Sequence, residues 1–112
     1  MNKTEIIKIL RKYNFDKDKY LVISGAAMVL LGIKESTSDI DISVTKDYYN
    51  YLLKNYNCTF EKINEYNREV YFIDNIINFG IDYYKKEIIF VEDFPVQIPE
   101  NILKLKLYGK EN

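Results

Sequence analysis

The stretch that most constrains the fold is residues 20–44, where two apolar segments flank a run of small residues and a polar loop. It opens with an apolar run that predicts a buried strand over 20–24. Ser24-Gly25 then turns the chain into a short helix of small residues, predicted over 25–31. The polar loop leads to a second predicted strand over 39–44, which begins with the sequence Asp-Ile-Asp.

The rest of the chain shows helical and strand periodicities in succession. Apolar residues at three- and four-residue steps predict helices over 3–13, 46–56 and 99–108. Apolar and alternating runs predict strands over 58–63, 69–73 and 76–84, a short strand or extended segment over 88–91, and an extended segment between Pro95 and Pro99. Asp74-Asn75 is predicted as a two-residue hairpin turn. We therefore expect one α/β or α+β domain over 1–112, with a mixed sheet of about five strands flanked by helices.

Composition narrows the chemistry available to such a domain. The chain has 112 residues, 47% of them hydrophobic, which favours a folded domain with a small core. It contains no histidine, which excludes imidazole acid–base catalysis and histidine zinc sites, and its one cysteine excludes an internal disulfide. The net charge of −1 argues against a surface built to bind duplex nucleic acid. Residues 1–5 lack the apolar core of a signal sequence, so we expect a cytoplasmic protein.

Asp39 and Asp41 carry the clearest chemical signal. Side chains alternate along a strand, so both carboxylates are expected on one side and Ile40 on the other. Two carboxylates held this way suit Mg²⁺ or Mn²⁺, which prefer oxygen ligands and often share them with substrate phosphates. Taken alone, an Asp-x-Asp pair on a strand is more often a solvated face of a sheet.

Ser24-Gly25 complements this pair. A glycine lets the backbone approach a phosphate closely, and the N–H groups that open the following helix favour an anion. A glycine at the start of a short helix is by itself mostly a turn device. The order of the features, a buried strand, Ser-Gly, a small-residue helix and then Asp-Ile-Asp, favours phosphoryl or nucleotidyl transfer.

This order resembles the nucleotidyltransferases of the DNA polymerase β-type superfamily. Their signature is an apolar residue, Gly, Gly or Ser, nine to thirteen residues, and then Asp, an apolar residue and Asp or Glu. Ile23-Ser24-Gly25 and Asp39-Ile40-Asp41 match its two halves. Ala27, Gly32 and Thr37 fall where a small bacterial branch, which includes abortive-infection toxin enzymes, places them. The sequence departs from this pattern at Ser24, which replaces the first glycine.

The resemblance implies a set of site residues. Asp39, Asp41 and a third carboxylate would bind the metal and act in catalysis. Asp82, which follows an apolar residue on a predicted strand, is preferred over Asp74, whose place in a turn has its own explanation. The nucleotide-binding residues implied by the same resemblance are Ser24, Gly25, Thr37, Ser38 and Lys106.

The resulting expectation is a metal-dependent enzyme that moves a nucleoside monophosphate from a nucleoside triphosphate to an unknown acceptor. The acceptor is a protein, an RNA end or a small molecule, and the setting is toxin–antitoxin or phage defence. A protein partner or a homodimer could complete the site of so short a chain. The alternatives are an inactive nucleotidyltransferase fold that serves as a binding or antitoxin-like partner, and a structural domain whose aspartates only solvate a sheet edge.

Overall fold

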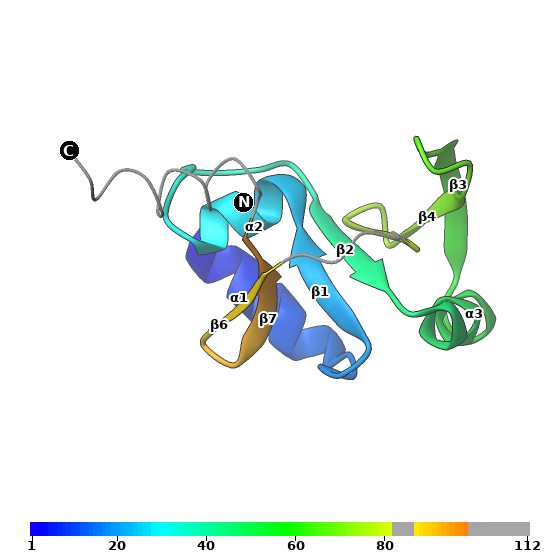
Figure 1. Ribbon diagram of the computed structural model, residues 1–112, viewed down its shortest axis with the longest axis horizontal. Coiled ribbons are helices and arrows are strands. Elements are labelled where there is room, and N and C mark those ends of the chain that lie inside the picture. The colour runs from blue at the N-terminus through cyan, green and yellow to red at the C-terminus, as the bar shows by residue number, and fades with distance from the viewer. Residues whose placement is uncertain (82–86, 99–112) are drawn as a thin grey trace.

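The computed structural model describes residues 1–81 and 87–98. Three helices and seven strands follow one another in this part of the chain (Figure 1). The helices are α1 (Lys3–Tyr13), α2 (Ser24–Leu30) and α3 (Lys46–Asn55). The strands are β1 (Tyr20–Ile23), β2 (Ile40–Val44), β3 (Cys58–Ile63), β4 (Glu69–Ile73), β5 (Ile77–Gly80), β6 (Ile88–Val91) and β7 (Phe94–Gln97).

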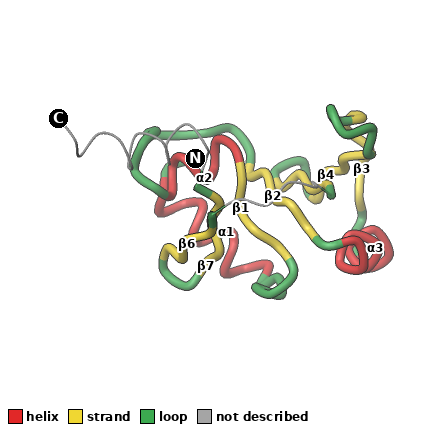
Figure 2. The backbone as a smooth tube through the Cα atoms, viewed as in Figure 1, coloured by secondary structure: helices red, strands yellow, loops and turns green. Residues whose placement is uncertain are grey.

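All seven strands belong to one mixed, open sheet, in the order β3-β4-β5-β2-β1-β7-β6. β2 runs parallel to β5 and β1 runs parallel to β7, whereas the other neighbouring strands are antiparallel. Figures 1 and 2 show α1 and α2 beside the part of the sheet that contains β1 and β7, and α3 beside β3. The protein is therefore an α+β domain, as expected, in which β1 and β2 occupy the middle of the sheet.

One face of this sheet carries the hydrophobic core. The register pairs Val22 with Ile42 and Ile42 with Phe79, so these three buried side chains share a face. They form a single cluster with the apolar sides of all three helices. The alternate residues of the same strands, Asp41 among them, therefore lie on the opposite face.

The two longer helices begin at side chains that cap them. The side chain of Asn2 accepts a hydrogen bond from the N–H of Glu5 at 2.9 Å, and the Glu5 carboxylate accepts one from the N–H of Asn2 at 3.0 Å. The hydroxyl of Thr45 accepts from the N–H of Tyr48 at 3.4 Å. The helices predicted over 3–13 and 46–56 are thus confirmed, with α3 ending one residue early.

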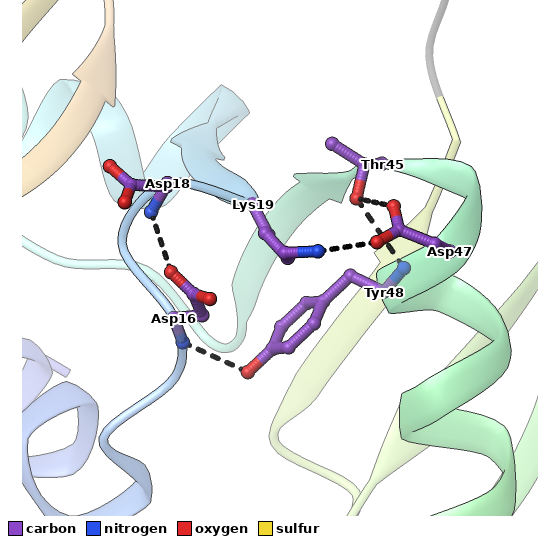
Figure 3. A network of polar contacts seen from close by, with 6 residues as sticks. All are labelled: Asp16, Asp18, Lys19, Thr45, Asp47 and Tyr48. Carbon is purple, nitrogen blue, oxygen red and sulfur yellow. Dashed lines mark hydrogen bonds and ion pairs between the residues drawn. The ribbon is translucent and has the colours of Figure 1, made fainter.

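A polar network ties the turn after α1 to the start of α3 (Figure 3). The Asp47 carboxylate accepts hydrogen bonds from the Lys19 ammonium at 2.5 Å and from the Thr45 hydroxyl at 2.6 Å. The N–H of Asp16 donates to the hydroxyl of Tyr48 at 2.9 Å, and the N–H of Asp18 donates to the Asp16 carboxylate at 3.0 Å. This network fixes the end of β2 relative to the turn that leads into β1.

The sheet differs from the expected one in three places. It has seven strands rather than about five, because residues 88–91 form a strand and residues 94–97 form another despite Pro95. Val22–Val96 is the one register pair between β1 and β7, so the missing N–H of Pro95 removes no bond from that ladder. The strand predicted over 76–84 is shorter, since β5 ends at Gly80, and the hairpin loop holds three residues, 74–76, rather than two. The helix predicted over 99–108 lies outside the described residues.

In the described part of the chain, no helix is both long enough and apolar enough to cross a membrane.

Candidate functional site

A small pocket lies where β1 turns into α2, beside the middle of β2. Its volume is about 140 Å³. Its lining residues come from five strands, their flanking turns and the first residue of α2: Ile23, Ser24, Asp41, Lys62, Asn64, Glu65, Val70, Asn78 and Gly80. The pocket therefore brings Ser24 and Asp41, two of the predicted site residues, into one place.

Asp41 is the central residue of this pocket. It lies on β2 between Ile23 of β1 and Asn78 of β5, which are its register partners. Its Oδ1 atom is buried and has no hydrogen-bond partner among the described residues. Burial, followed by the negative charge of Asp39, raises the pKa of the Asp41 carboxyl from 3.8 to about 6, against an opposing hydrogen bond from Asn78.

Asp39 directly precedes β2 rather than belonging to it, so the predicted strand began one residue too early. It is half-buried and its charge acts on Asp41, but it does not line the pocket. Among the described residues, no group of three acidic, histidine or cysteine side chains is arranged to hold a metal ion. Asp82, the predicted third ligand, lies outside the described residues. Asp74, its rival, is exposed and accepts a hydrogen bond from the Tyr13 hydroxyl.

Ser24 makes the turn that the sequence predicted, at a conformational cost. It is the first residue of α2 and has a φ of 57°, in the left-handed region that favours glycine. Ile23 stands at the N-cap position, and no side chain caps the helix. Ser24, which stands where the resembled pattern has its first glycine, therefore has a strained backbone conformation.

Gly25 is required by a close approach of the following loop. A Cβ atom at this position would lie 2.9 Å from the Thr37 hydroxyl oxygen and 3.6 Å from the Lys34 ammonium nitrogen. Thr37 is therefore beside the Ser24-Gly25 turn, as its predicted role requires. Ser38 is exposed in the same loop and does not line the pocket. Lys106 lies outside the described residues.

Four polar residues of the pocket were not among the predicted site residues. Asn78 is only 8% exposed and lies beside Asp41. A single polar residue inside the apolar run of β5 was the signal that could have identified it. Lys62, Asn64 and Glu65 come from the β3–β4 hairpin. Nothing in their local sequence marks them, because their position depends on the twist of the sheet.

The residues present fit a divalent cation shared with a substrate. Mg²⁺ is usually held by one or two carboxylates, with phosphate oxygens and waters completing its shell. The unpartnered, buried oxygen of Asp41 is the kind of atom that such an ion would satisfy. A volume of about 140 Å³ is below the roughly 300 Å³ at which ligand pockets begin, so it suits phosphate and cation rather than a whole nucleotide.

Comparison of the chain with protein families, curated proteins and solved structures finds no match.

Proposed function

We propose that the protein is a metal-dependent nucleotidyltransferase of the DNA polymerase β type, which moves a nucleoside monophosphate from a nucleoside triphosphate to a hydroxyl group. The observation that carries this proposal is the shared pocket of Asp41 and Ser24, with Asp39 acting electrostatically on Asp41. A partly buried carboxylate with a raised pKa is typical of a functional site. The close contact between Gly25 and Thr37 adds the compact turn that a phosphate-binding loop needs.

Asp39 and Asp41 would hold Mg²⁺ or Mn²⁺. When bound, the ion would neutralise phosphate charge and align the attacking and leaving oxygens. The backbone at Ser24-Gly25 and the Thr37 hydroxyl would orient the phosphate chain. The acceptor oxygen would form a bond to the α-phosphorus while the bond between the α-phosphorus and the oxygen that bridges to the β-phosphate breaks. Pyrophosphate would leave, and the proton of the acceptor hydroxyl would pass to a base. Asp82 remains our prediction for that base.

The proposal is tested by calorimetric titration of ATP with Mn²⁺ into the wild type and two matched variants. Asp41→Asn removes the carboxylate in the pocket, whereas Asp47→Asn removes an exposed carboxylate outside it. We expect metal-dependent binding that Asp41→Asn weakens about 100-fold or more and Asp47→Asn leaves unchanged. Equal binding by all three proteins would contradict the proposal.

Catalysis is tested separately from binding. The wild type and Asp41→Asn are incubated with each α-labelled nucleoside triphosphate and a cell extract, and label transferred to protein, RNA or small molecules is measured. We expect transfer by the wild type alone. Metal-dependent binding without any transfer would instead favour a nucleotide-binding partner built on the same fold.

A further inference from the structure

The end of the β3–β4 hairpin forms part of the wall of the pocket that Ser24 also lines. Lys62 and Glu65 come from the outgoing side of this hairpin and its turn, and Val70 comes from the returning strand. Val70 is paired with Lys62 in the register of the two strands. The hairpin at the edge of the sheet thus reaches back to a pocket that opens beside the central strands.

Asn64 holds a fixed orientation in this wall. Its Oδ1 atom accepts hydrogen bonds from the N–H groups of Tyr66 at 2.9 Å and Arg68 at 3.0 Å. The backbone N–H of Asn64 also donates to the Arg68 carbonyl at 2.8 Å. Because Oδ1 is committed to the turn, the Nδ2 group is left as a donor beside Gly80, within 3.8 Å of where a Cβ of that glycine would lie. The Nδ2 group of Asn64 makes no hydrogen bond within the described part of the chain.

Lys62 supplies positive charge to the same wall. It forms no ion pair within the described residues, and its charge lowers the pKa of Asp41. The pocket also contains the carboxylates of Asp41 and Glu65, so its formal charge is negative when all three side chains are ionised. A bare phosphate is therefore disfavoured there, whereas a phosphate that arrives with a divalent cation matches both signs of charge.

We propose that Lys62 and Asn64 bind the phosphate chain of the cation-bound nucleoside triphosphate in the pocket that Ser24 and Asp41 also line. Lys62 provides a charge-assisted hydrogen bond, and Asn64 provides an amide donor that the hairpin turn has already oriented. This inference rests on the proposed nucleotidyltransferase function and assigns its phosphate contacts to the β3–β4 hairpin. It requires no contribution from Lys106.

The test uses inorganic tripolyphosphate, which carries the phosphate chain without a base or sugar. Its binding in the presence of Mn²⁺ is measured by calorimetry for the wild type, Lys62→Gln, Lys62→Arg and Asn64→Asp. Asn64→Asp keeps an oxygen acceptor for Tyr66 and Arg68 but replaces the Nδ2 donor with a second oxygen. Lys54→Gln, which removes an exposed lysine from the end of α3, is the control for charge alone.

We expect Lys62→Gln to weaken binding about tenfold, the loss typical of one charge-assisted hydrogen bond. Lys62→Arg should recover most of that loss, Asn64→Asp should weaken binding at least as much as Lys62→Gln, and Lys54→Gln should have no effect. Mn²⁺ alone should bind Lys62→Gln at least as tightly as the wild type, because a positive charge has been removed. A merely structural role of Lys62 would not produce these opposite changes.

The two proposals fail in different ways. If the wild type does not bind Mn²⁺–tripolyphosphate or Mn²⁺–ATP, the proposed function itself is wrong. If the wild type binds both and Asp41→Asn does not, but Lys62→Gln and Asn64→Asp bind like the wild type, then the assignment to the hairpin alone is overturned.

Discussion

Asp41 and Asp47 lie close together in the chain and in opposite environments. Asp47 is exposed, and the Lys19 ammonium, followed by the Thr45 hydroxyl, lowers the pKa of its carboxyl to about 2 (Figure 3). Asp41 is half-buried, has an oxygen without a partner, and has its pKa raised to about 6. The chain thus pairs one carboxylate fully and leaves one oxygen of the other without a partner, at a cost in stability. Such a cost is expected where a residue serves a ligand rather than the fold.

The largest effect on stability should come from Asp41→Asn. The folded-state pKa of Asp41 lies above its unfolded value of 3.8, so its contribution to stability is fully present below pH 3.8 and is lost as the pH rises through about 6. Removing the charge should therefore raise the free energy of unfolding of the metal-free protein by up to about 3 kcal/mol at pH 8. Urea unfolding at several pH values measures this gain, which should disappear below pH 4.

Asp47→Asn is the matched control and should act in the opposite direction. The lowered pKa of Asp47 stabilises the fold above pH 3.8, and this contribution is lost as the pH falls through about 2. The variant should therefore be less stable than the wild type at neutral pH. A loss of stability for both variants at pH 8 would contradict the contrast between the two carboxylates.

A smaller effect is expected at Ser24, which begins the turn beside Asp41. Its φ of 57° costs a residue other than glycine about 1 kcal/mol, so Ser24→Gly should stabilise the protein by about that amount. Ser38→Gly is the control, because Ser38 does not have a positive φ. Thermal unfolding of the two variants compares them, and equal changes in the midpoint would show that the backbone at Ser24 is not strained.

Much of the fold could be predicted from local sequence. The periodicity of α1 and α3 placed both helices within one residue. The segment between Pro95 and Pro99 was predicted only as extended, and a proline is disfavoured in a strand with neighbours on both sides. The structure tolerates this proline because β1 and β7 share a single register pair, which is a tertiary feature that the sequence does not display.

The candidate site also has one part that local sequence predicts and another that depends on tertiary structure. Ser24 and Asp41, which line the pocket, and Gly25 and Thr37, which lie close to each other, all belong to one continuous stretch whose strand–turn–helix pattern the sequence displays. The hairpin residues of the pocket could not be predicted, because a register shift between Phe60 and Lys62 and the pairing of distant strands determine where they lie. Local patterns reveal one side of a pocket, whereas the other side depends on how distant strands pair.

The most direct test of the account is whether a divalent cation binds at Asp41 in preference to Asp47. Trace Mn²⁺, added to the isotope-labelled protein, broadens the NMR signals of the backbone amides nearest to the bound ion. We predict the strongest broadening at Asp39, Asp41 and Asn78, its loss in Asp41→Asn, and its persistence in Asp47→Asn. Broadening centred on Asp47, or a pattern unchanged in Asp41→Asn, would contradict the claim that the carboxylate of Asp41, with its unpartnered oxygen, binds a cation.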